Sequence, residues 1–263
     1  MEHFANTRVV IREMYRNAAR AERLAALRAE VRTLESAGTA EGRPCLPFGL
    51  DALDSRLAGG GLPVPALHEA AGERPGPADE AAAILFLASI AARRPGTVLW
   101  ALGSRDLFAP GLAAAGLAPG RVLYAECGRD EDVLAVMEEG LRHGGLAAVV
   151  GEVFRAPMPA ARRLQLAAEE GGTLALMLRR RRGGGEDPLA PPSAAVTRWR
   201  LACAPSSPLP VPGVGRPRWR LALARQRGGE PFELVLESPD EEGRLALPPA
   251  PLDRAGAEKR AAA

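Results

Sequence analysis

The sequence predicts an α/β protein: a mainly parallel twisted sheet flanked by helices, with antiparallel strands at its C-terminal end and an additional N-terminal helix. Between residues 66 and 178, short apolar segments typical of buried strands alternate with segments typical of helices. This alternation favours parallel strands joined by crossover helices. After residue 193 the helical segments stop, and strand-like segments are separated only by turn-rich stretches, which favours antiparallel pairing.

The N-terminal helix is expected over residues 8–35, where apolar residues recur at helical spacing and arginines recur every four residues on another face. We expect it to dock either on its own domain or on a helix of a partner. Within the sheet region, strands are expected at 66–71, 97–102, 121–125, 146–150 and 173–178, and helices at 79–94, 109–116, 130–143 and 159–170.

Three final strands are expected at 194–204, 216–225 and 232–237. The first two share the pattern Arg-Trp-Arg-Leu-Ala, at 198–202 and 218–222. Because side chains alternate between the two faces of a strand, the Trp and Leu residues are expected to face the core and the arginines to face outward.

Composition divides the chain into four parts. Residues 1–36 form a helical arm, residues 37–47 a linker that contains Gly and Pro, and residues 48–238 the core. Residues 239–263 are rich in Pro, Ala and charged residues, and a disordered tail is expected there.

Charge and cysteine content limit the function classes. The net charge is +2, but residues 173–229 carry 11 basic and 2 acidic residues, which suggests a polyanion or an acidic protein surface as partner. A solvated arginine face is the alternative. The three cysteines lie far apart, which argues against a disulfide framework or a zinc site. No secretory signal is visible, and the longest apolar run is shorter than the ~18 residues of a membrane span. We therefore expect a cytoplasmic protein with no metal and no membrane contact.

The turn between the first strand and helix of the core, Gly72 to Asp79, is where an α/β sheet usually binds phosphate. A P-loop there requires Gly-x-x-x-x-Gly-Lys-Ser/Thr, in which the lysine reaches the outer phosphates and the hydroxyl holds magnesium. Gly72 and Gly76 are present, but Pro77 takes the second glycine position. Ala78 and Asp79 stand at the lysine and hydroxyl positions. We therefore expect a degenerate nucleotide loop, no cofactor and no ATP hydrolysis.

The segments that lead into this loop carry a resemblance. Gly49-Leu50-Asp51-Ala52-Leu53-Asp54, the turn Gly59-Gly60-Gly61-Leu62-Pro63 and a strand with Glu69 resemble the entry to the RecA recombinase core. Residues 179–193 fall where RecA-type proteins carry a DNA-contacting loop. With the arginine-rich N-terminal helix, the lost P-loop and the paired Arg-Trp-Arg strands, the chain resembles the ImuA family of RecA-like accessory proteins from bacterial damage-induced mutagenesis cassettes.

The resemblance implies a non-catalytic RecA-like adaptor in SOS-induced, error-prone translesion DNA synthesis. Its implied partner is ImuB, an inactive Y-family polymerase-like protein. RecA and, through the complex, an error-prone DnaE-type polymerase are further partners, which would bring the protein to the nucleoid after damage. Two alternatives stay open: a cell-division inhibitor that resembles SulA, and a basic RecA-like protein that binds DNA outside such an assembly.

The residues expected to contact a partner or DNA are arginines, because the planar guanidinium makes bidentate contacts with carboxylates and phosphates. No catalytic residue is predicted. The candidate contacts lie on the N-terminal helix, in the loop after residue 178 and on the last strands: Arg8, Arg12, Arg16, Arg20, Arg179, Arg180, Arg181, Arg182, Arg198, Arg200, Arg218 and Arg220.

Overall fold

The computed structural model describes residues 44–183, 185–206, 209 and 213–249, together with residues 20, 22, 23, 26, 27 and 30. These last six are helical and exposed, as expected for the N-terminal helix. Arg8, Arg12 and Arg16 lie outside the described residues. No helix in the described part of the chain is long and apolar enough to cross a membrane.

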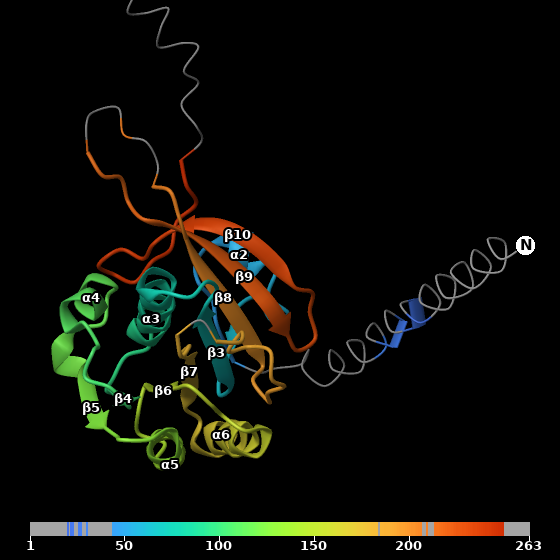
Figure 1. Cartoon of the computed structure of the whole chain (residues 1–263), viewed down its shortest axis with the longest axis vertical. Helices are drawn as coiled ribbons and strands as arrows, with labels where there is room; N and C mark the ends of the chain where they lie inside the picture. The colour runs from blue at the N-terminus through green and yellow to red at the C-terminus, as the bar shows by residue number, and fades with distance from the viewer. Residues whose placement is uncertain are drawn as a thin grey trace, which may run out of the picture.

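One eight-stranded sheet organises the core, in the order β10-β9-β8-β3-β7-β6-β4-β5 (Figure 1). The six strands from β8 to β5 are parallel, and β9 and β10 extend the sheet with antiparallel pairing. The strands are β3 (Leu67–Gly72), β4 (Val98–Leu102), β5 (Val122–Glu126), β6 (Ala148–Val153), β7 (Leu174–Arg179), β8 (Thr197–Ala204), β9 (Arg218–Gln226) and β10 (Phe232–Glu237). The predicted fold class is therefore confirmed.

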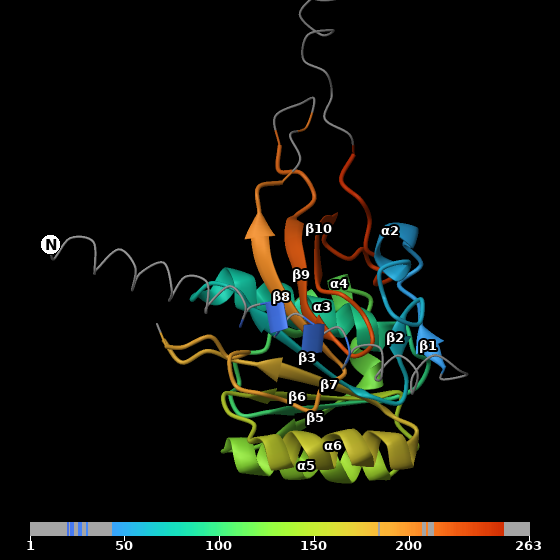
Figure 2. The ribbon, with the colours of Figure 1, turned by 90° about the vertical axis from the view of Figure 1, so that its right-hand side faces the viewer.

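Helices cover both faces of this sheet, as Figure 2 shows. One face carries α5 (Asp130–Arg142) and α6 (Met158–Gly171), and the other carries α3 (Pro77–Ala92) and α4 (Ala109–Ala114), which the 3-10 turn η1 (Pro119–Arg121) follows. Each face has its own apolar core. On the α3 side Trp199 lies edge-on against Phe86, with ring centroids 5.4 Å apart, so the Trp of the first repeated segment faces the core as predicted.

A small entry unit precedes the sheet, with strands β1 (Cys45–Leu46) and β2 (Leu62–Pro63) around the short helix α2 (Asp51–Asp54). The carboxylate of Asp54 accepts the backbone N–H groups of Phe48, Gly49 and Leu50. This turn needs Gly49, whose φ is 72°. The Gly-x-x-x-Leu-Asp segment is therefore a self-capped turn that seats Leu53 in the core.

The end of the core differs from the sequence-based expectation. Residues 239–249 are described, whereas a disordered tail was expected from residue 239. The Glu237 N–H donates to the carbonyl of Ala246, and Leu245 is buried in the core on the α3 side. Gly243, with φ 76°, passes close to the turn after α4. A single turn thus brings the chain back against the sheet after β10.

Candidate functional site

The Gly72–Asp79 loop connects the carboxyl end of β3 to the first turn of α3. A Cβ atom on Gly72 would lie 2.8 Å from the backbone of Asp79, so only glycine allows this close approach. Gly76 has φ 121°, a conformation that other residues rarely adopt. Pro77 begins α3, a position that tolerates the missing N–H. Both glycines of the Gly72–Asp79 loop are thus required by the backbone conformation of the loop itself.

Asp79 points into the protein and closes the loop. Its carboxylate accepts the Arg74 guanidinium at 2.8 Å, the Arg74 backbone N–H at 3.0 Å and the Cys203 backbone N–H at 2.8 Å. Burial opposes ionisation of Asp79, but these donors outweigh it and hold the pKa of the carboxyl below its usual value. The residue at the hydroxyl position is therefore a clamp between α3, the loop and β8.

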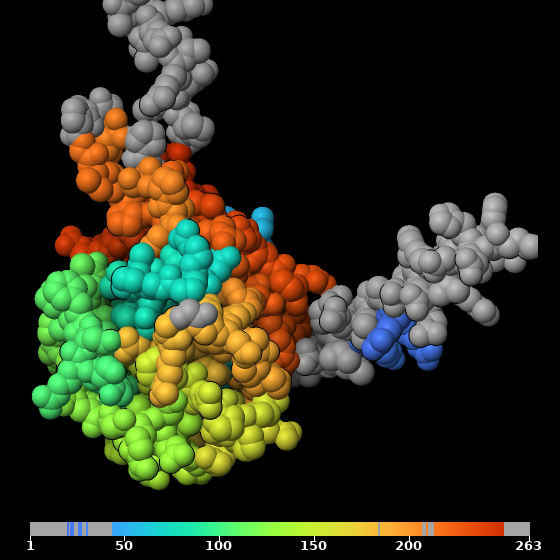
Figure 3. Space-filling view, viewed as in Figure 1, coloured from blue at the N-terminus to red at the C-terminus, as the bar shows by residue number. Residues whose placement is uncertain are grey.

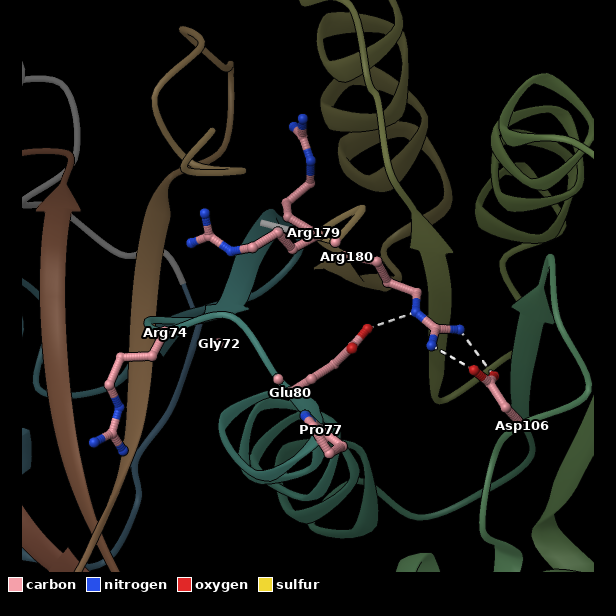
Figure 4. A pocket seen from close by; sticks show the side chains of 10 residues that line it. Gly72, Arg74, Pro77, Glu80, Asp106, Arg179 and Arg180 are labelled. Atoms are coloured by element: carbon pink, nitrogen blue, oxygen red, sulfur yellow. Dashed lines mark hydrogen bonds and ion pairs between the residues drawn. The ribbon is translucent and has the colours of Figure 1, made fainter. Parts of the chain in front are cut away.

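The loop offers little to a phosphate group. Arg74 also donates to the carbonyl of Cys203, and Figure 4 shows its side chain directed toward β8, away from Glu80. The Glu73 N–H donates to the carbonyl of Leu201, and Ala78 at the lysine position is exposed and apolar. Several hydrogen-bond donors of this turn therefore already bind acceptors within the protein.

Arg180 occupies the space beside the loop, directly after β7. Its guanidinium contacts Glu80 at 2.6 Å, Asp106 at 2.5 and 2.9 Å, and Glu152 at 3.2 Å. Figure 4 shows Glu80 and Asp106 directed toward Arg180 from α3 and from the segment after β4. The bidentate contact with Asp106 raises the pKa of Arg180, and the same contact lowers the pKa of Asp106. We call these four residues the Arg180 cluster.

Glu152 is the innermost carboxylate of this cluster. The strand before it was expected to end at residue 150, but β6 continues to Val153, so Glu152 lies within the strand. Its Oε1 accepts the indole N–H of Trp100 at 2.7 Å. Burial raises the pKa of Glu152 above its usual value. Within the described residues, no group of His, Cys, Asp and Glu side chains is placed to hold a metal ion.

Arg179 and Arg198 are buried, and the prediction that Arg198 faces outward is wrong. Both pair with Glu69 on β3: Arg198 Nε lies 2.7 Å and Arg179 Nη1 3.3 Å from its carboxylate oxygens. Ser193 donates a hydrogen bond to the same carboxylate at 2.6 Å. The sheet face opposite Trp199 is itself covered here, because Ser193 and α6 lie over it. We call Glu69, Arg179, Arg198 and Ser193 the Glu69 cluster.

The other predicted arginines lie nearer the surface and have different partners. Arg200 pairs with Asp187, and Arg220 pairs with Glu73 and Glu233. Arg218 donates to backbone carbonyls at the base of the β8–β9 connection. Arg20 is exposed on the N-terminal helix. The structure thus brings Arg200 and Arg220 into internal ion pairs and leaves Arg20 apart from the site.

Three arginines around a neighbouring cavity form no salt bridge with a carboxylate among the described residues, although Arg181 lies near enough to Asp187 to help lower the pKa of its carboxyl. Arg181 donates to the carbonyls of Glu73 and Gly185, Arg182 lies 4.6 Å over the ring of Phe154, and Arg155 is exposed. They line an open cavity of about 590 Å³ beside the beginning of α6. Sequence reasoning missed Arg155. Its place directly after a buried strand, at the edge where the other arginines meet, was the available signal.

Comparison with known proteins gives two findings. The chain is 38% identical over 211 residues to Protein ImuA of Caulobacter vibrioides, found in two strains, with 77% of this chain and 86% of the relative covered. Its structure is similar to that of the RadB recombinase, with a TM-score of 0.50 and 16% identity over 75% of this chain and 97% of that one. The second finding shows the fold alone. No protein-family model matches the chain.

Proposed function

The chain belongs to the ImuA family, and on that premise we propose that it is a non-catalytic RecA-like adaptor in error-prone translesion DNA synthesis. Its proposed direct partner is an ImuB-type polymerase-like protein. RecA and a DnaE-type polymerase would join through the complex, in the cytoplasm and at the damaged nucleoid. The likeness to SulA is not proposed further, because the family relation to ImuA covers 77% of the chain at 38% identity.

The clamp at Asp79 is the observation that most favours a binding role over ATP hydrolysis. A nucleotide loop must present free N–H groups and a cation to the phosphates. Here the carboxylate of Asp79 holds the N–H of Arg74 and the side chain of Arg74, and it also ties the loop to Cys203. Glu80, in the first turn of the helix, adds a negative charge beside the loop. These contacts favour a loop that stabilises the fold instead of binding ATP.

A candidate docking surface lies at the far edge of the sheet. β5 is the last strand in the sheet order, and its Leu123 and Tyr124 side chains are 56% and 43% exposed. An edge strand offers backbone donors and acceptors to an added strand, and exposed apolar side chains strengthen such pairing. We propose this edge as the surface for the polymerase-like partner. Sequence reasoning placed the contacts on arginines and missed it, because exposure of one strand is not visible in its sequence.

The adaptor proposal is tested by co-purification of tagged full-length chain with the ImuB-type protein of the same cell. We expect the partner to be recovered with the wild-type chain and lost with Leu123→Asp, which places a charge on the β5 edge. Leu166→Asp is the matched control, because Leu166 is 62% exposed on α6, on another surface. Failure of the wild-type chain to recover the partner would remove the adaptor proposal. Loss with both variants would remove only the assignment to β5.

Nucleotide binding is tested separately by titration of the same protein with Mg·ATP in a calorimeter. We expect no saturable heat. Saturable binding, followed by phosphate release, would show that the chain is an ATPase and not an adaptor of the proposed kind.

DNA contact is the second candidate function, and the cavity beside α6 favours it. Arg155, Arg181 and Arg182 place three positive charges there that form no salt bridge among the described residues, and Asp187, which also lines the cavity, pairs with Arg200. Such groups bind backbone phosphates, and the affinity then falls steeply with salt. Anisotropy of labelled single-stranded DNA is expected to report weaker binding for Arg181→Ala/Arg182→Ala and unchanged binding for Arg218→Ala. An equal loss with Arg218→Ala would assign the effect to overall charge.

A further inference from the structure

Arg180 connects three parts of the chain that are far apart in sequence. Its contacts reach Glu80 in the first turn of α3, Glu152 on β6 and Asp106 after β4. Its guanidinium also lies 5.7 Å from the centre of the Phe154 ring. Only 12% of the side chain is exposed. In Figure 3 the beginning of α3 and the segment after β7 lie side by side on one face of the molecule.

The place that Arg180 fills is the one where open α/β sheets hold their ligands, outside the carboxyl ends of the parallel strands. A bound ligand at such a place joins the helix that follows one strand to the loops that follow its neighbours. Here a side chain of the protein makes those connections. The cluster opposes one guanidinium to three carboxylates, and burial of Glu152 makes its charge costly without a cation nearby.

The segment that follows Arg180 has several attachments of its own. Arg181 donates to the carbonyl of Gly185, Arg182 lies over Phe154, and Asp187 pairs with Arg200 on β8. Residues 181–183 and 185–187 are half-buried or exposed, so these attachments lie near the surface, where single contacts contribute little to stability. The chain after residue 187 is held differently, because Leu189 and Ser193 are buried and Ser193 bonds to Glu69. Arg180 is the anchor next to the N-terminal end of the surface part, directly after Arg179, which is buried against Glu69.

We propose that Arg180 is a built-in substitute for a ligand: it fixes the surface segment 181–187 against α3 and β6 in one arrangement, without nucleotide. This goes beyond the adaptor role, because it concerns how the surface is held. In an open α/β sheet a bound ligand could hold this surface, whereas in this chain a side chain holds it permanently. A partner that binds this surface would then bind equally well with and without ATP.

Hydrogen exchange of the full-length chain tests the proposal with Arg180→Met, which keeps the length of the side chain and removes the charge. We expect exchange in residues 181–187 to become roughly tenfold faster or more, with α5 unchanged, because the segment opens locally. Arg218→Met is the matched control, since the contacts of Arg218 with described residues are to the carbonyls of Pro205 and Ser206, and it is expected to leave this segment unchanged. Exchange at the wild-type rate in Arg180→Met would overturn the proposal.

A second variant separates the anchor from the cost of stranded carboxylates. Arg180→Met/Glu152→Gln removes the buried negative charge as well, so we expect the melting temperature to recover in part while exchange in 181–187 stays fast. Recovery of both would show that Arg180 only neutralises Glu152. If Arg180→Met does not fold, Asp106→Asn gives the same test with a smaller expected effect. Slower exchange in the wild-type segment on addition of Mg·ATP would also overturn the proposal.

Discussion

The Glu69 cluster and the Arg180 cluster are built in opposite ways. In the first, one carboxylate lies between two arginines, and Glu69 has no exposed surface. In the second, one guanidinium lies among three carboxylates, and Asp106 is about half exposed. The first joins three central strands, whereas the second joins the sheet to a surface segment. We therefore expect the Glu69 cluster to determine global stability and the Arg180 cluster to determine local order.

The strongest test of this comparison is Glu69→Ala. It leaves Arg179 and Arg198 buried without a counter-ion, and we expect the free energy of unfolding to fall by about 3–5 kcal/mol. Denaturant unfolding measures this loss. Glu80→Ala is the control, since Glu80 is a partly exposed member of the other cluster and a smaller loss is expected. Equal losses in the two variants would abolish the distinction between the clusters.

Asp79→Ala is expected to have the next largest effect. The backbone N–H of Cys203 loses its acceptor, and the Arg74 side chain loses its partner. An unsatisfied donor costs about 1–3 kcal/mol, and we expect a loss of that size in the same unfolding experiment. Asp79→Asn keeps one acceptor oxygen and should lose less. A loss below that of Asp79→Asn would show that the clamp does not stabilise the fold.

The pH dependence of stability separates carboxylates with lowered pKa values from the one with a raised pKa value. The pKa values of Asp79 and Asp106 are held below their usual range, so their contribution is present at pH values above the unfolded pKa and is lost as pH falls through the folded one. Glu152 has a raised pKa, so its contribution has the opposite sign and is lost as pH rises through that value. We expect Glu152→Gln to remove this second component from the pH profile measured by thermal unfolding. An unchanged profile would contradict it.

The smallest expected effect is that of Asp106→Asn on global stability. Asp106 is about half exposed, and ion pairs of that kind contribute about 0.2–1 kcal/mol. Chemical denaturation should therefore detect little change, while hydrogen exchange in residues 181–187 increases. A large global loss would place Asp106 among the residues that hold the sheet together.

The sequence predicted the order and type of the elements well, because buried strands and covering helices have distinct apolar patterns. The strand boundaries lie within two residues of those expected, except at the end of β6 and the beginning of β8, which are each displaced by three. At β6 the indole N–H of Trp100 and the guanidinium of Arg180 satisfy Glu152 inside the strand. Both partners are remote in sequence, and no local sequence pattern predicts these contacts.

The charged residues were harder to place for the same reason. Alternation along β8 correctly separated Trp199 from Arg198, yet it could not show that the second face of the strand is also covered. Asp79 was interpreted only as a missing hydroxyl residue of a nucleotide loop. Its partner Cys203 lies 124 positions further along the chain, so its structural role became visible only when β8 was placed beside β3.

The clamp at Asp79 has a consequence for which substitutions the loop tolerates. A mutation that placed a hydroxyl residue at this position would first remove the contacts to Arg74 and Cys203, and the chain would lose stability before any lysine at position 78 had a phosphate to bind. Introduction of a P-loop sequence here therefore passes through a less stable intermediate. Selection for a stable fold is enough to keep the carboxylate at this position, with or without selection on nucleotide binding.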